Sequence, residues 1–261
     1  MDAFERIVEE TVRSGIAPCG QRYEGIFDGY SELPFAFRSS AYPFTTASGV
    51  IENALEKAEG TETGARLSMR GIVRAMRLVT ELSSKKSNVR MIVVRVTGSM
   101  LDGGDLFSAL VAAMEEEGFE ETDKVCLEFP VSILEKEKSA LKRAISEIKA
   151  AGFKVAVSPI KKDFAFAALT EIKFDYVFLS PELTALAEDR SNVGVLAAII
   201  ALLHTMGVGA IAEGVMSDDV IRELTAVECA GLIPSEGFNG EFVLPTGITD
   251  EKYVLSFEEE E

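Results

Sequence analysis

Short apolar segments alternate with helical patterns along the last two thirds of the chain, and this alternation restricts the fold more than any other feature. Each segment has the length of a strand and is rich in branched and aromatic residues at nearly every position. Such runs are typical of parallel strands that are covered on both faces. The predicted strands are 91–96, 124–129, 154–158, 175–179 and 208–212.

Turn and capping residues between the segments agree with this pattern. Gly118, Gly152 and Gly207 each follow a helical run, where a residue in the left-handed conformation commonly ends a helix. Ser217 stands where it can cap the helix that follows it. Repeated strand–helix units with short links predict an α/β fold with a parallel sheet, either open or closed into a barrel. The expected helices are 105–117, 132–151, 164–172, 192–206 and 218–227.

The N-terminal third is less regular. Neither an internal repeat nor a shift in composition divides the chain, so we expect one domain over residues 1–261, with a helix within 1–20 and an acidic tail at 246–261. The other expected elements are strands at 23–27 and 35–37 and helices at 4–13, 49–58 and 67–82.

Charge and hydropathy limit the partners that we expect. The net charge of −17 repels the phosphates of nucleic acids. Apolar runs fall short of the roughly 20 residues that a membrane helix needs. The first ten residues are acidic and amphipathic, unlike a secretory signal peptide. We therefore expect a cytoplasmic protein without nucleic-acid or membrane partners.

The sequence offers little material for zinc or histidine chemistry. The three cysteines, Cys19, Cys126 and Cys229, are far apart, and no CxxC or HExxH spacing occurs. Cys126 lies in an apolar run and is expected to be a small buried residue. The single histidine, His204, lies on a predicted helix and is expected to be structural.

Four blocks of the C-terminal half point to a family. They are KVCLEFPVSIL at 124–134, AGFKVAVSPI at 151–160, FDYVFLSPEL at 174–183 and LHTMGVGAIAEGVMSDDVIRELTAVEC at 203–229. In order and spacing they resemble the LELTES, DDFG, DYLKIDRS and AEGVE blocks of EAL domains, the bacterial cyclic di-GMP phosphodiesterases. In the N-terminal half, LPFAFRSSAYP and MIVVRVTGSM are loosely similar to the EALLRW segment and to the strand with a metal-ligand Asn. The resemblance implies a TIM-like (β/α)8 barrel with its site at the C-terminal ends of the strands.

Enzymes of this family use two divalent cations, Mg²⁺ or Mn²⁺, which need several oxygen ligands. By the resemblance, most ligand positions here carry other residues. The Glu of the EAL motif falls on Pro34 or Phe35, and the metal-ligand Asn falls on Arg95. The other replacements are Ser158 and Pro159 for the DDFG aspartates, Phe178 for a lysine, Val131 and Met216 for two glutamates, and Ile233 or Glu236 for a Gln.

Glu128 and Glu213 are the two carboxylates that keep their family positions. Two carboxylates beside an arginine do not make a two-metal site, so we expect no catalytic residue, no metal ligand and no Mg²⁺ or Mn²⁺ cofactor. Arg95 is expected to pair with Glu128 in place of the cation. Glu213 has the alternative role of orienting its loop. The expected vestigial site comprises Glu128, Glu213, Arg95, Ser158 and Phe178.

Three functions follow from the resemblance, in decreasing order of support. The first is a catalytically inactive regulatory or protein-interaction module. The sequence does not identify its protein partner, and the resemblance allows a homodimer. The second is a non-catalytic receptor for cyclic di-GMP, with Arg38 and Arg95 as candidate phosphate ligands. The third is a residual phosphodiesterase that uses loop carboxylates such as Asp163 or Glu236.

Overall fold

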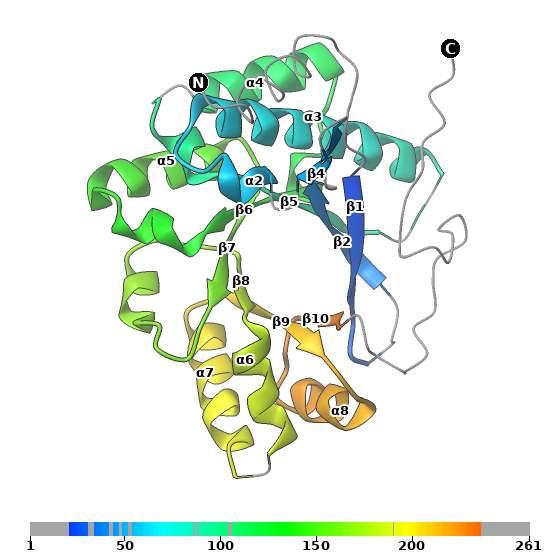
Figure 1. The fold of residues 1–261 in the computed structure, drawn as a ribbon, viewed down its shortest axis with the longest axis vertical. Helices are drawn as coiled ribbons and strands as arrows, with labels where there is room; N and C mark the ends of the chain where they lie inside the picture. The colour runs from blue at the N-terminus through cyan, green and yellow to red at the C-terminus, as the bar shows by residue number, and fades with distance from the viewer. Residues whose placement is uncertain are drawn as a thin grey trace.

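The strands close into a barrel with helices around it (Figure 1). Around the barrel the order is β1-β10-β9-β8-β7-β6-β5-β2, and only β1 runs antiparallel to its neighbours. This architecture confirms the expected α/β barrel. The computed structural model describes residues 21–30, 34–41, 44–46, 49–51, 54–85, 87, 89–103, 106–189 and 191–235.

The barrel strands are short, as their sequences predict. They are β1 (Gln21–Phe27), β2 (Pro34–Ala41), β5 (Met91–Arg95), β6 (Val125–Pro130), β7 (Lys154–Ile160), β8 (Tyr176–Leu179), β9 (Gly209–Val215) and β10 (Gly231–Pro234). A separate hairpin pairs β3 (Phe44–Thr46) with β4 (Gly49–Ile51).

Helices follow most strands. The α-helices are α2 (Ala54–Lys57), α3 (Glu62–Ser84), α4 (Leu106–Glu117), α5 (Lys138–Ala150), α6 (Pro181–Thr184), α7 (Val193–Thr205) and α8 (Asp218–Ala226). Short 3₁₀ helices are η1 (Gly98–Leu101), η2 (Thr122–Lys124), η3 (Val131–Glu135), η4 (Phe166–Thr170) and η5 (Ala185–Glu188). Within the described residues, no helix is long and apolar enough to cross a bilayer.

The predicted helix ends are confirmed. Gly118, Gly152 and Gly207 all have positive φ, the conformation that glycine adopts without steric cost. The Ser217 hydroxyl accepts a hydrogen bond from the backbone N–H of Val220 and caps α8. These local signals are reliable because each depends on one residue and its immediate neighbours.

Three predicted elements differ from the structure, and one strand was not predicted. The segment 132–151 is divided into η3 and α5 instead of forming one helix. The segment 49–58 contains β4 and the four-residue α2 instead of one helix. The segment 164–172 forms only η4, where Phe164 and Phe166 stack edge to face with ring centroids 5.3 Å apart. The strand β10, at 231–234, was not predicted because GLIP is short and ends in proline. The expected N-terminal helix and acidic tail lie outside the described residues.

Side chains inside the barrel form a core that is separate from the helix–sheet core. Strand residues alternate between the two. On β5, Met91 and Val93 point inward, whereas Ile92 and Val94 pack against the helices. The inner core also contains Ile26, Ala36, Cys126, Ala156, Phe178, Ile211 and Ile233, so the predicted burial of Cys126 is confirmed.

Candidate functional site

Polar side chains follow this apolar interior at the barrel mouth, in a layer that is staggered from strand to strand. Each stands two residues after an interior residue of its strand, so the same alternation that fills the barrel points it inward. Their predecessors are Ala36, Val93, Cys126, Ala156 and Ile211. The mouth residues are Arg38 on β2, Arg95 on β5, Glu128 on β6, Ser158 on β7 and Glu213 on β9.

The strongest contact in this layer joins Arg38 to Glu128. Nε of Arg38 donates to Oε2 of Glu128 at 2.7 Å, and Nη2 donates to Oε1 of the same carboxylate. Both side chains are buried, with Glu128 only 1% exposed. A guanidinium pairs well with a carboxylate in this two-point geometry, because its N–H groups form a rigid planar fork.

The same guanidinium also binds Glu213. Nη1 of Arg38 lies 3.0 Å from Oε2 of Glu213, whose side chain is 18% exposed. The other carboxylate oxygen, Oε1 of Glu213, is buried and has no hydrogen-bond partner. Arg38 therefore neutralises two carboxylates from one position.

Ser158 and Phe178 complete the surroundings of this ion cluster. The hydroxyl of Ser158 donates to Oε1 of Glu128. The guanidinium carbon of Arg38 lies 4.6 Å from the ring centroid of the fully buried Phe178. A cation over an aromatic face is attracted by the ring, and most strongly when both are desolvated. Phe178 thus closes the barrel interior and supports the cation above it.

Arg95 takes a lesser part than its sequence position predicts. Its Nε is 3.6 Å from Oε1 of Glu128, its Nη2 is 3.8 Å from Oε1 of Glu56, and its side chain is 36% exposed. The predicted pairing of Arg95 with Glu128 is present as this longer ion pair, but Arg38 makes the closer contacts and holds the central position that was expected of Arg95. Arg38 pairs with Val93 across the sheet and so starts one inward layer deeper than Arg95.

Burial and charge shift the pKa values of this cluster in opposite directions. Burial alone would raise the pKa of Glu128, but Arg38, Arg95 and the Ser158 hydroxyl hold it below its ordinary value. Burial raises the pKa of Glu213 above its ordinary value, although Arg38 acts against the shift. Burial would lower the pKa of Arg38, but Glu128 and Glu213 raise it. Arg38 therefore stays charged.

The structure brings the five expected site residues together and adds Arg38 at their centre. The resemblance aligned the EAL glutamate with Pro34 or Phe35, but the β2 residue that meets Glu128 and Glu213 is Arg38. The inward alternation of Ala36 and Arg38 on β2 is the sequence signal that could have identified it. Of the other aligned positions, Met216 is exposed, Val131 is half-buried, Ile233 lies in the barrel interior and Glu236 lies outside the described residues.

Comparison with known domains identifies the family of this chain. The family model of the EAL domain matches residues 49–232. This chain belongs to the EAL domain family. No curated protein matches it.

Solved EAL structures share the fold at low sequence identity. The FimX EAL domain from Pseudomonas aeruginosa bound to c-di-GMP is 13% identical, with a TM-score of 0.77 over 92% of this chain and 96% of that chain. The EAL domain of Mycobacterium smegmatis DcpA is 16% identical, with a TM-score of 0.66 over 82% and 87%. The EAL enzyme Bd1971, in its form with cAMP and cyclic di-GMP, is 14% identical, with a TM-score of 0.73 over 88% of this EAL domain. The chain spans 63% of the length of Bd1971.

At the mouth of this EAL domain, the Glu128 oxygens that a divalent cation would need already have hydrogen-bond donors. Each oxygen of Glu128 accepts a hydrogen bond from Arg38, and Ser158 takes a further site on Oε1. Metal ions need such oxygens as ligands and are repelled by a guanidinium beside them. Across the part of the chain that the structure describes, no three Asp, Glu, His or Cys side chains are grouped so that they could hold a metal ion.

Proposed function

We propose that this EAL domain does not hydrolyse cyclic di-GMP and acts as a regulatory module that binds protein. The observation that carries the proposal is the position of Arg38 between Glu128 and Glu213. The guanidinium lies between the two carboxylates and supplies a positive charge of the kind that the chemistry of the family requires of metal ions.

Displacement of Arg38 by a cation is energetically unfavourable. Arginine does not lose its proton in proteins, so the guanidinium cannot become neutral beside an incoming ion. It would have to leave both carboxylates and its contact with Phe178. The desolvation of a buried ion without its partner costs several kcal/mol. A catalytic metal pair is therefore not expected at this mouth.

The outer face of α7 supports a protein-binding role. Val193–Thr205 contains no Asp, Glu, Lys or Arg, and Val195 and Leu202 on this helix are 52% and 45% exposed. Exposed apolar side chains that gather on one helix face commonly mark a contact surface. We propose a second copy of the chain as the occupant, because on a chain with a net charge of −17 an uncharged face is where two copies repel each other least.

A receptor role for cyclic di-GMP is the alternative. The solved structure of the PaMucR phosphodiesterase, which is 16% identical with a TM-score of 0.73 over 87% of this chain and 94% of that chain, is a c-di-GMP complex. In this domain, Arg38 is bound to carboxylates, which leaves the half-exposed Arg95 as the candidate phosphate ligand at the mouth. Titration calorimetry with cyclic di-GMP separates the two roles, because a receptor releases or absorbs heat and a pure protein-binding module does not.

Hydrolysis assays test the proposal directly. The purified chain is incubated with cyclic di-GMP and Mg²⁺ or Mn²⁺, and linear product is measured by chromatography. PaMucR serves as the positive control and Glu128→Gln as the matched negative control. We expect product at the level of the buffer blank for both this chain and Glu128→Gln. Product above the blank that Glu128→Gln abolishes would contradict the proposal.

A further inference from the structure

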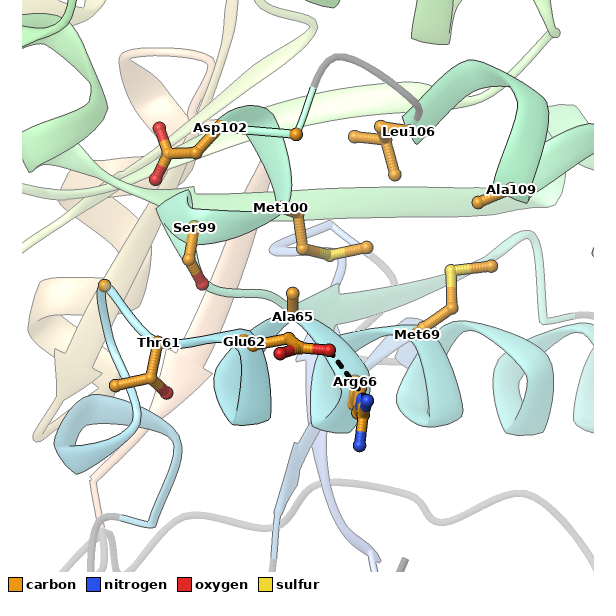
Figure 2. A pocket seen from close by; sticks show the side chains of 12 residues that line it. Thr61, Glu62, Ala65, Arg66, Met69, Ser99, Met100, Asp102, Leu106 and Ala109 are labelled. Atoms are coloured by element: carbon orange, nitrogen blue, oxygen red, sulfur yellow. Dashed lines mark hydrogen bonds and ion pairs between the residues drawn. The ribbon is translucent and has the colours of Figure 1, made fainter. Parts of the chain in front are cut away.

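A groove lies outside the barrel, between α3 and the η1–α4 segment (Figure 2). Its volume is about 530 Å³, which is within the range of small-molecule sites. Its floor is preformed, because Met100 and Leu106 belong to the hydrophobic core and are only 7% and 9% exposed. A hollow with a fixed floor suits a small molecule and offers little surface to a partner protein. The groove contains none of the mouth residues, so its role is independent of the function proposed above.

The two ends of this groove differ in polarity. Figure 2 shows Met69 and Leu106 toward one end, where α3 faces α4. Thr61, Ser99 and Asp102 lie toward the other end, beside the start of α3 and the η1 segment. A ligand that fills the groove therefore needs an apolar body and one polar end.

A chain of three hydroxyl groups determines what the polar end of the groove recognises. The hydroxyl of Ser68 donates to the carbonyl oxygen of Gly64 at 2.8 Å. Oγ1 of Thr97 lies 3.2 Å from Oγ of Ser68, and Oγ of Ser99 lies 2.7 Å from Oγ1 of Thr97. Because a carbonyl oxygen only accepts, three hydroxyl hydrogens satisfy all three contacts in one direction only, from Ser99 inward to Gly64. The Ser99 hydrogen is thus used within the protein, and its oxygen is the acceptor that faces the groove.

Thr61 presents an acceptor to the groove for the same reason. Its hydroxyl donates to the carbonyl oxygen of Ala58 at 2.6 Å and accepts a hydrogen bond from the backbone N–H of Gly64 at 3.1 Å. A hydroxyl group has one hydrogen and two lone pairs, so one lone pair of Thr61 is left for a further donor.

The charged side chains at this groove also have acceptor capacity left. Arg66 donates to Glu62 at 2.7 Å, and Lys136 donates to Asp102, so both cations already have partners. Each carboxylate has a second oxygen that can accept further hydrogen bonds. Exposed ion pairs of this kind are weak and rearrange readily around a charged ligand. The net charge of −17 favours a ligand that is positively charged.

We propose that the groove binds a small organic ammonium ion with an aromatic body, such as an aryl-alkyl amine. An ammonium group has three N–H donors and no acceptor, which matches the oxygens of Thr61, Ser99 and Asp102. The aromatic ring lies against Met69 and Met100, because thioether sulfurs make favourable contacts with aromatic rings. A carboxylate of the same size would place acceptors against acceptors and is excluded.

Nuclear magnetic resonance titrations of the full chain with two probes of similar shape test the site. The probes are phenylethylammonium, which carries the donors, and phenylpropanoate, which carries acceptors. We expect the ammonium probe to shift the methyl signals of Met69 and Met100 with a dissociation constant of about 1 mM. The carboxylate probe should bind at least about tenfold more weakly. Equal affinity for the two probes, shifts confined to the exposed Met216, or no saturable shift would overturn the proposal.

Two pairs of variants locate the bound ammonium probe. Ala109→Phe fills the apolar end of the groove and should abolish the saturable shifts, whereas Ala112→Phe, also exposed on α4 but outside the groove, should preserve them. Asp102→Asn removes a charged acceptor and should weaken binding about threefold to fivefold. Asp123→Asn, an exposed aspartate on η2, makes the same change in net charge away from the groove and should leave the affinity unchanged. Wild-type affinity in either Ala109→Phe or Asp102→Asn would overturn the proposal.

Discussion

Arg38 on β2 and Glu128 on β6 are joined by two hydrogen bonds across the barrel mouth, although β5 lies between their strands. The contact is made because Arg38 starts one layer deeper than Arg95 and its long side chain reaches toward the mouth. With Glu213 it forms a buried cluster in which one cation serves two carboxylates. The stability of the fold should therefore depend on the charges of these three side chains.

Removal of the central cation should destabilise the fold strongly. Arg38→Met leaves Glu128 buried without its partner, and breaking a buried pair in this way typically costs about 3–5 kcal/mol. Arg95→Met removes a half-exposed and longer contact, so we expect a loss of at most about 1 kcal/mol. Urea denaturation of the two variants measures the difference.

A double variant separates the ion pair from the packing of the arginine stem. Arg38→Met with Glu128→Gln should be less destabilised than the sum of the two single variants, because no unpaired charge remains. Additive losses would show that the Arg38–Glu128 pair does not stabilise the mouth.

The strand–helix pattern predicts an α/β fold, and the family resemblance predicts that it closes into a barrel, but neither predicts the centre of the site. The strands and helix ends depend on local patterns, such as the alternating inward residues of β5 and the glycine at 118. The resemblance makes Arg38 a candidate phosphate ligand and does not predict its ion pair with Glu128. That ion pair depends on which residues of β2 and β5 lie opposite each other, and the sequence does not show this register. Which of two arginines reaches Glu128 depends on the depth of each strand in the barrel, a property of the closed sheet.

Glu213 should make stability fall as pH rises. Its folded pKa lies above the unfolded value of about 4.3, so the folded state binds the proton more tightly. The free-energy cost of ionising Glu213 in the folded state is absent below its unfolded pKa and complete above its folded pKa. The free energy of unfolding of the wild type, relative to Glu213→Gln, should therefore decrease as pH rises through this interval. Urea titrations between about pH 4 and 7 measure it.

Glu128 should have the opposite effect on the pH dependence of stability. Its folded pKa is lowered, so the stability that it contributes is present above about pH 4.3 and is lost as pH falls toward the folded value. The wild type should lose stability on acidification relative to Glu128→Gln. Parallel pH curves for both variants would contradict the assignment of opposite shifts to the two carboxylates.

The exposed face of α7 should carry the contact between two copies. Leu202→Glu introduces one charge per copy on a helix that contains no Asp, Glu, Lys or Arg, and like charges across a closely packed interface are destabilising. Sedimentation at increasing concentration should show dimers for the wild type and monomers for Leu202→Glu. Arg222→Glu, on the charged helix α8, is the control and should behave like the wild type. A monomeric wild type would exclude this contact.

Reversal of the central charge should convert the mouth into a cation site without restoring catalysis. Arg38→Glu places three carboxylates together, and their mutual repulsion should lower the melting temperature. Mn²⁺ relieves such repulsion and binds only the folded variant. At a free Mn²⁺ concentration of about 100 times the dissociation constant, it should increase the free energy of unfolding by about 2.7 kcal/mol. The wild type should show no matching shift, since Arg38 already neutralises Glu128 and Glu213. Hydrolysis should stay absent, because Arg95 and Ser158 remain at positions where the family resemblance implies further metal ligands. An equal shift in the wild type would show that Arg38 does not exclude cations.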